Sequence, residues 1–331
     1  DAAAALADAW STDNLRLRPI QAQIAAGLAT VAQARSVLAM QSKNQELASQ
    51  FDQEVLSQLR NWVENSPENA GAHDRLAAAL LKSGDMEGAV ASFDRARQLN
   101  PSLPVTDLRL ARSQITNGND TAALESLNRA IAEHSQDANV LASAADLLLV
   151  MGKLDETEQQ IEAALKLDPN ALPVQRLQAQ LLRYRGQWES AAEKLQKLNT
   201  ENPTDFETAN LLGMTLSELD EEARRRALSL ATVTAQRFDL ESPQGRRARI
   251  TLIWAAYSAG KVDAAKQALN KLLQTGIESN QISGDEGFYL ARLLVEFGRP
   301  EIAAPLLESV LSRIGSFPKR AAAENLATQL K

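Results

Sequence analysis

The side chains that most often carry catalysis or hold metals are scarce in this sequence. It contains no cysteine and only two histidines, His73 and His134, which lie far apart along the chain. A zinc site needs several Cys or His ligands at short spacings, and a thiolate nucleophile needs a cysteine. We therefore expect no catalytic residue, no metal site and no cofactor, and we predict that the protein is not an enzyme.

Phosphate-binding loops are also missing. The sequence holds neither a G-x-G-x-x-G run nor a Walker loop, and Gly260-Lys261 is interpreted as a turn followed by a polar residue. Its acidic pairs are typical of solvated helix faces, because no motif places them in a pocket.

Arginines are concentrated in one region, at Arg224 to Arg226 and at Arg246, Arg247 and Arg249. Nearby carboxylates, at Glu221, Glu222 and Glu241, favour an exposed and charge-balanced face. A patch for phosphate or for an acidic partner is the alternative that the residues leave open.

Composition excludes several classes of function. The formal net charge is -7, from 35 basic and 42 acidic residues, which disfavours binding to nucleic acid or anionic membranes. The apolar run from Leu147 to Met151 is far shorter than the ~18 residues of a membrane span, so no membrane insertion is expected. Aromatic residues make up 4%, while alanine and leucine are abundant, which favours an all-α fold.

The compartment stays open. A chain without cysteine fits the bacterial cytoplasm as well as the periplasm. The sequence begins with Asp1 and an Ala-rich run instead of an initiator methionine, which suggests a trimmed or processed start.

A fixed period of 34 residues organises the middle of the chain. Gly84, Gly118, Gly152 and Gly186 follow one another at this step. Small residues keep the same step, and a bulky apolar residue follows each of them four positions later; the pairs are Ala89 and Phe93, Ala123 and Leu127, Thr157 and Ile161, and Ala191 and Leu195. Such a period is typical of stacked repeats.

Each column has a physical reason. The glycine ends a first helix at a turn where positive φ would penalise a β-carbon. The small residue lets the second helix approach the first, and the bulky residue fills the space one turn later. Prolines then stop the second helix, at Pro101, Pro169 and Pro203.

These columns resemble the tetratricopeptide repeat family, whose unit is a 34-residue helix-turn-helix. The segment that carries the resemblance best holds Leu76, Ala77, Leu80, Gly84, Ala89, Phe93, Ala96 and Pro101. The family's leading Trp is replaced, at His73, Asp107, Leu141 and Gln175. The resemblance implies an all-α, right-handed solenoid of antiparallel helix pairs.

The repeat predicts the following division of the chain. Residues 1–69 form a helical region with a degenerate repeat and with Pro19 near a helix start; 70–205 hold four regular units; 206–245 are an irregular fifth unit; 246–316 hold two further units; and 317–331 form a capping helix. The apolar face of that cap is predicted at Ala321, Leu326 and Leu330.

The resemblance also implies a binding surface, because first helices line the concave face in this family. The partner-binding residues expected there are Arg112, Arg176, Gln180, Arg183, Tyr184, Trp254, Tyr257, Phe288 and Arg292. Arg and aromatic side chains often anchor interfaces. Trp254 and Tyr257 fit packing between repeats equally well.

Arg176 and Arg183 project from the same side of one helix, since seven residues make two turns. A guanidinium binds a carboxylate in a two-pronged hydrogen bond, so an acidic peptide is the predicted guest. The alternative is that both arginines pair with carboxylates of neighbouring repeats. The family's carboxylate clamp is not expected, because the first clamp positions fall at Asp74 and Ala78.

The function predicted from these patterns is a scaffold that binds a partner protein or peptide in the concave groove. The alternative is a non-catalytic regulatory or spacer domain of a larger bacterial enzyme or polysaccharide-export or secretion protein. The partner, the pathway and the oligomeric state cannot be predicted from these residues.

Overall fold

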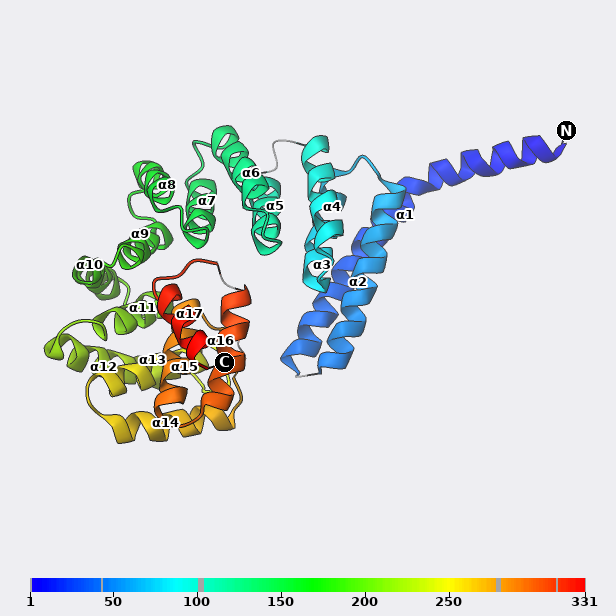
Figure 1. Cartoon of the computed structure of the whole chain (residues 1–331). Coiled ribbons are helices and arrows are strands. Elements are labelled where there is room, and N and C mark those ends of the chain that lie inside the picture. Colours follow the sequence, from blue (N-terminus) through cyan, green and yellow to red (C-terminus); the bar gives the residue numbers. More distant parts are fainter. Residues whose placement is uncertain (1, 43, 101–103, 278–280, 314, 331) are drawn as a thin grey trace. The chain divides into compact units, whose positions relative to one another are not determined.

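The computed structural model describes residues 2–42, 44–100, 104–277, 281–313 and 315–330. Helices dominate these residues and no β-strand occurs among them (Figure 1). The predicted all-α solenoid of antiparallel helix pairs is confirmed. The chain divides into two compact units, Asp1–Ser135 and Gln136–Lys331.

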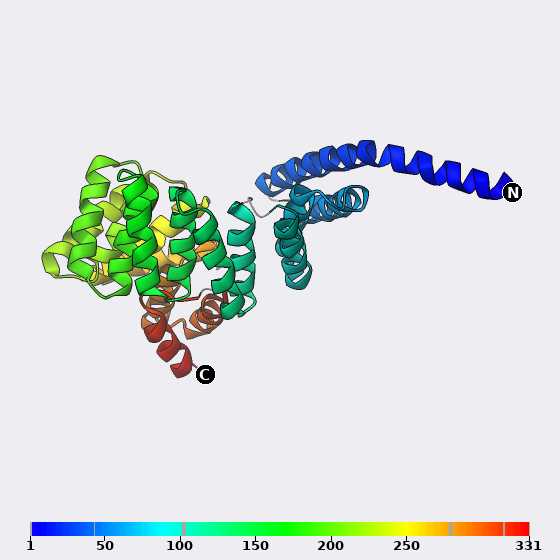
Figure 2. The same cartoon turned by 90° about the horizontal axis from the view of Figure 1, so that it is seen from above.

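The first unit consists of a long hairpin followed by two shorter helix pairs. Its helices are α1 (Ala2–Gln41), α2 (Gln45–Asn65), α3 (Ala70–Ser83), α4 (Met86–Leu99), α5 (Pro104–Thr116) and α6 (Asp120–Glu133). Helix α1 packs along α2 and then continues past its end (Figure 2). Pro19 was expected near a helix start but lies inside α1. Pro101 falls outside the described residues.

The second unit continues the pairs and ends with a short helix. Its helices are α7 (Ala138–Val150), α8 (Leu154–Leu167), α9 (Leu172–Tyr184), α10 (Trp188–Glu201), α11 (Phe206–Leu216), α12 (Glu221–Gln236), α13 (Pro243–Ser258), α14 (Val262–Gln274), α15 (Gly284–Glu296), α16 (Pro300–Arg313) and α17 (Arg320–Gln329). The first helices of successive pairs contact one another, α7 with α9, α11 with α13 and α13 with α15.

The turns inside the pairs have the backbone that the glycine column predicts. All six repeat glycines have positive φ between 71° and 86°: Gly84, Gly118, Gly152, Gly186, Gly260 and Gly298. At the first of these turns, the amide of Asp85 donates to Leu80 O at 3.0 Å and the amide of Gly84 donates to Leu81 O at 3.2 Å. This Schellman motif ends α3, and the Asp85 carboxylate then caps α4 by accepting from Gly88 N at 2.9 Å.

The small and bulky columns form the interior of the pairs. Ala89, Ala123, Thr157 and Ala191 are fully buried, as are the bulky residues Phe93, Leu127, Ile161 and Leu195. Each small side chain sits one helical turn before a bulky one, so the two helices of a pair approach closely without leaving a void.

The fifth pair is irregular, as its sequence indicates. Asp220 caps α12 by accepting from Ala223 N at 2.8 Å, in place of a glycine turn. Helices α12 and α13 have 16 residues each, against 13 or 14 in the regular pairs of this unit. Helix α13 begins at Pro243, before residue 246, where the sixth unit was predicted to start.

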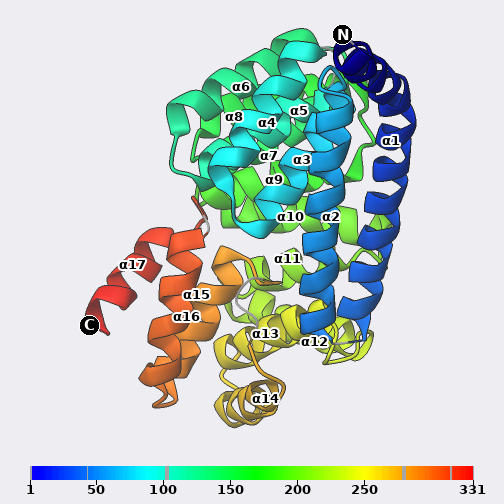
Figure 3. The same ribbon diagram turned by 90° about the vertical axis from the view of Figure 1, so that its right-hand side faces the viewer.

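The last helix packs against α15 and α16 (Figure 3). Its buried face consists of Ala323, with Leu326, Ala327 and Leu330 partly buried beside it. Ala321 was predicted on this face but is exposed. The helix begins at Arg320 rather than at Phe317, so residues 317–319 do not belong to it.

Candidate partner-binding surface

The first helices of the second unit line a pocket of about 330 Å³, called the inner pocket below. Its walls come from α7, α9, α11 and α13, the start of α15 and residues 316–318. Of the predicted site residues, Gln180, Arg183 and Tyr184 line it, together with Asn210, Met214 and Arg247 from the other first helices. Most of the residues that line the inner pocket thus belong to first helices.

A buried ion pair forms one wall of the inner pocket. Arg183 Nη2 lies 2.6 Å from Asp285 Oδ2, and the two side chains are 3% and 5% exposed. The guanidinium also lies over the Trp188 ring, 5.6 Å from its centroid. Arg183 Nε and Asp285 Oδ1 find no hydrogen-bond partner among the residues that the structure describes. One buried polar atom on each side of the pair is therefore unpaired within the described part of the chain.

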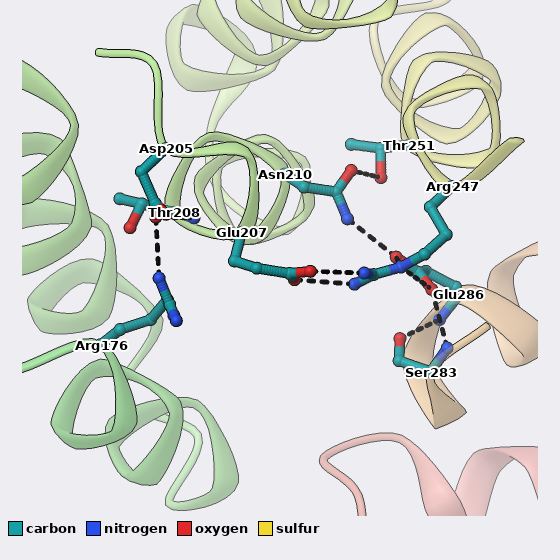
Figure 4. Close-up of polar contacts among 9 residues, drawn as sticks. All are labelled: Arg176, Asp205, Glu207, Thr208, Asn210, Arg247, Thr251, Ser283 and Glu286. Atoms are coloured by element: carbon teal, nitrogen blue, oxygen red, sulfur yellow. Dashed lines mark hydrogen bonds and ion pairs between the residues drawn. The ribbon is translucent and has the colours of Figure 1, made fainter. Parts of the chain in front are cut away.

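A second arginine, Arg247 of α13, binds two carboxylates (Figure 4). It donates to Glu207 through Nη1 and Nη2, at 2.6 and 2.9 Å, and to both oxygens of Glu286 through Nε, at 3.0 and 3.1 Å. Burial alone would lower the pKa of Arg247, but the charges of Glu286 and Glu207 together outweigh it and raise that pKa. The arginine stays charged and joins α11, α13 and α15.

Glu286 is the centre of this network and is fully buried. Besides Arg247, it accepts from Asn210 Nδ2 at 2.8 Å and from the amide of Ser283 at 2.7 Å. Ser283 Oγ accepts in return from the amide of Glu286 at 3.2 Å, which completes a capping box at the start of α15. Thr251 donates to Asn210 Oδ1 at 2.7 Å. Arg247, Asn210 and the Ser283 amide, which face Glu286, thus all have hydrogen-bond partners.

Arg176 is engaged nearby, outside the residues that line the inner pocket (Figure 4). Its Nη1 lies 2.8 Å from Asp205 Oδ2, the residue that caps α11 through Thr208 N. Burial would raise the pKa of Asp205, but the hydrogen bonds from Thr208 and the charge of Arg176 outweigh it and lower that pKa. Arg176 and Arg183 thus both pair with carboxylates, Arg176 with the residue that caps the next helix pair and Arg183 with a residue 102 positions further on rather than with a neighbouring repeat.

The chain's own segment 315–319 occupies one end of this surface. Ser316 donates its amide to Val150 O at 2.6 Å, and its carbonyl accepts from the Tyr184 hydroxyl at 2.8 Å. Burial and the charge of Asp285 raise the pKa of Tyr184, so its hydroxyl stays a donor. The backbone of one residue is therefore held from both sides, by α7 and by α9.

Side chains of the same segment anchor it further. Phe317 is buried against Gly284, where a β-carbon would lie only 2.4 Å from the ring. Lys319 forms an ion pair with Glu218 and lies over the Trp188 ring, 4.6 Å from its centroid. The segment is fixed by backbone, aromatic and charged contacts at once.

The predicted aromatic group belongs to the core and not to a partner surface. Trp254 and Phe288 are each 5% exposed. Trp254 stacks on Tyr289 with the centroids 4.3 Å apart and on Tyr257 at 6.0 Å. Arg292 is exposed and covers the Trp254 ring at 5.4 Å. The expectation that Trp254 and Phe288 contact a partner is corrected here, because neighbouring helices already cover them.

Arg112 lies on α5 in the first unit, where it is exposed. Sequence reasoning missed Glu207, Asp285 and Glu286, because acidic residues were interpreted as solvated. It also missed the segment 315–319. The capping box Ser283 to Glu286 is a signal that could have marked the start of α15.

Two further properties of the described residues concern other functions. No helix among them is long and apolar enough to cross a bilayer. Nor do three or more of their His, Asp or Glu side chains gather where they could hold a metal ion.

Known proteins resemble the chain in its repeats and its fold. Residues 80–144 and 142–206 each match a family model described as tetratricopeptide repeat. Over 138 residues, 42% of the chain, it is 27% identical to DnaJ homolog subfamily C member 3 of Mus musculus and 26% identical to that of Bos taurus. This match spans only 26% of each relative's length.

Solved structures are similar over most of the chain. Yeast Tom70 gives a TM-score of 0.58 at 15% identity, covering 87% of this chain and 60% of that one. A tetratricopeptide repeat protein from Parabacteroides merdae ATCC 43184 gives 0.51 at 13% identity, covering 92% and 99%. Identities this low concern the fold alone. The two model matches, with the repeat columns and their positive-φ glycines, show tetratricopeptide repeats over residues 80–206.

Proposed function

We propose that the chain is a scaffold that holds an extended protein segment in the inner pocket and acts by binding rather than by catalysis. Proteins of this repeat fold are protein-interaction scaffolds in general. The observation that supports the finer proposal is the way in which Ser316 is held. Val150 O and the Tyr184 hydroxyl bind its backbone, so this surface already accommodates a non-helical stretch of protein.

The charges of the inner pocket bear on the guest. Asp146, Glu207 and Asp285 contribute three carboxylates to its lining, against the two guanidiniums of Arg183 and Arg247. Both arginines are already paired. An acidic guest therefore loses the physical basis that the sequence suggested. We propose instead a guest that presents hydrogen-bond donors, as a backbone amide or a Lys or Arg side chain, to the carboxylates of this lining.

A blocking substitution tests this proposal. Gln180 lies on α9 and lines the inner pocket, while Gln159 is an exposed glutamine of α8 that does not. A protein captured from the native host by the intact chain is first identified by mass spectrometry. Its affinity is then measured by calorimetry for the intact chain and for the Gln180→Arg and Gln159→Arg variants.

We expect Gln180→Arg to weaken binding at least about tenfold, because the added cation fills the pocket and repels the guest's donors. Gln159→Arg should leave the affinity unchanged. Equal affinities for both folded variants would place the binding surface elsewhere on the chain.

A further inference from the structure

Helix α1 carries two different apolar faces. The first is made of small residues, at Ala22, Ala25, Ala29, Ala32, Ser36 and Ala39, and each is at most 4% exposed. This face packs on α2, where Ser36 Oγ donates to Asp52 Oδ1 at 2.6 Å. Contacts within the α1–α2 hairpin therefore explain why this face is apolar.

The second face is made of large residues that nothing within the described residues covers. They are called the α1 stripe here and comprise Leu17, Ile20, Ile24, Leu28, Val31 and Leu38, each between 44% and 63% exposed. At about 100° per residue, they lie within ~40° of one line along the helix, and the alanine face is centred ~110° away. A contiguous exposed apolar stripe marks an interaction surface, and α2 does not compete for this one.

The spacing of the stripe fits another helix. Leu17, Ile24, Val31 and Leu38 follow one another at steps of seven residues, the period of a coiled-coil seam. The series is also symmetric about the point between Gly27 and Leu28. A second α1 running antiparallel would set Leu17 opposite Leu38 and Ile24 opposite Val31, and the reverse pairs would form on the other side.

Gly27 is an independent observation at that centre. Glycine weakens a helix interior, yet this one is exposed, and a β-carbon built on it would meet nothing within 4 Å. No contact inside the chain therefore requires it. A second helix would, because Gly27 leaves room beside Leu28 for the Leu28 side chain of a second copy.

The antiparallel direction keeps the two Arg35 side chains apart. Between Asn14 and Gln45 the chain has no acidic residue, and Arg35 lies within the line of the stripe. Parallel copies would place the two Arg35 side chains side by side. Antiparallel copies separate them by ~22 Å along the axis, well beyond the Debye length of about 8 Å in physiological salt. The Arg35 guanidinium meanwhile turns toward α2, over the Phe51 ring at 5.2 Å.

We propose that this chain forms a homodimer through α1, which pairs antiparallel with α1 of a second copy around a two-fold axis beside Gly27 and Leu28. Such an interface is isologous, since each copy offers the same stripe. The heptad step, the symmetry, the exposed glycine and the separation of the two Arg35 side chains all support this one occupant.

Disulfide trapping tests the geometry, because the chain has no cysteine and gives no background. A Leu28→Cys variant should form a covalent dimer under mild oxidation. Leu17→Cys alone should not, because its copies would lie ~32 Å apart and a disulfide needs Cα atoms within about 7 Å. The double variant Leu17→Cys/Leu38→Cys should link again. A covalent dimer from Leu17→Cys alone would show a parallel pair and overturn the proposal.

Sedimentation equilibrium tests the association itself. The intact chain should reach twice the mass of one copy, and Ile24→Gln/Val31→Gln should weaken dimerisation at least about a hundredfold, since four buried apolar side chains are lost per dimer. Val37→Gln is the matched control, because Val37 is 49% exposed but lies ~140° from the stripe, so this variant should dimerise normally.

Two results would overturn the proposal. One is an intact chain that stays monomeric at every concentration, with no cross-link from Leu28→Cys. The other is a monomeric chain that sediments with phosphatidylglycerol vesicles, which would make the stripe a lipid-binding surface. All substituted positions are exposed, so circular dichroism should show unchanged folding in each variant.

Discussion

Replacing Glu286 by alanine should destabilise the second unit severely. This carboxylate is fully buried and accepts from Arg247, Asn210 and the amide of Ser283. Its loss would leave a buried amide group and a backbone amide without partners, and Arg247 with only one carboxylate. Breaking a buried pair in this way typically costs about 3–5 kcal/mol.

The matched control is Glu207→Ala, which removes the other carboxylate of Arg247. Glu207 is 45% exposed, so water can replace much of what it provides, and the expected cost is about 1 kcal/mol or less. Urea unfolding of the intact chain, followed by circular dichroism, gives the two free energies. Hydrogen exchange of peptides from α11, α13 and α15 assigns each loss to the second unit.

A double-mutant cycle separates the pair from its surroundings. Arg247→Met removes the charge, and combining it with Glu286→Ala should give a coupling of roughly 2 kcal/mol. If Glu286→Ala costs no more than Glu207→Ala, or if the coupling is close to zero, the buried network does not hold these three pairs together.

Three further outcomes can be checked by urea unfolding. Gly284→Ala should cost about 1–3 kcal/mol, since the new β-carbon would overlap the Phe317 ring, and loss of protection of residues 315–319 in hydrogen exchange would locate the damage. Ala323→Asp should cost about 2 kcal/mol or more, because it buries a charge beneath α17. Ala321→Asp, at an exposed position of the same helix, should change stability by less than about 0.5 kcal/mol. Similar values for both variants would show that α17 does not pack on the core. Because folding lowers the pKa of Asp205, its ionised form stabilises the chain above the unfolded pKa of about 3.9, and this stabilisation is lost as the pH falls through the lowered value. The Asp205→Asn variant keeps the helix cap, so its free energy of unfolding should fall less than that of the parent between about pH 5 and pH 3. Parallel pH profiles of the two proteins would contradict this.

The repeat period predicted the fold because it depends on local chemistry. A glycine such as Gly84 ends a helix through its own φ, and a small residue such as Ala89 lets one helix approach the next within 34 residues. Those requirements concern residues that are close together in the sequence. The helix pairs and the turns could therefore be predicted without any knowledge of distant contacts.

The candidate site depends on contacts that the period does not contain. Asp285 is 102 residues from Arg183, and which carboxylate meets which arginine follows from the curvature of the stack. Trp254 was placed on the partner surface by extending the repeat numbering across the irregular fifth pair. In the structure, Tyr289 of α15 stacks on this ring.

The cap shows a smaller version of the same limit. Leu326 and Leu330 were predicted correctly on its packed face, but Ala321 was chosen over Ala323. Two alanines so close together offer the same apolar signal. Only the position of α16 decides which one is covered.

The anchored segment 315–319 has a consequence for how the second unit is made. In an open stack of repeats, each pair depends on its neighbours only, and the array can form progressively from one end. Here Ser316 reaches back 132 residues to Tyr184, and Lys319 reaches back 101 residues to Glu218. On a ribosome, α7 and α9 emerge long before the segment that completes their surface. The unit should therefore finish folding only after residues 315–319 have emerged, and should lose its ends and its middle in a single step when it unfolds.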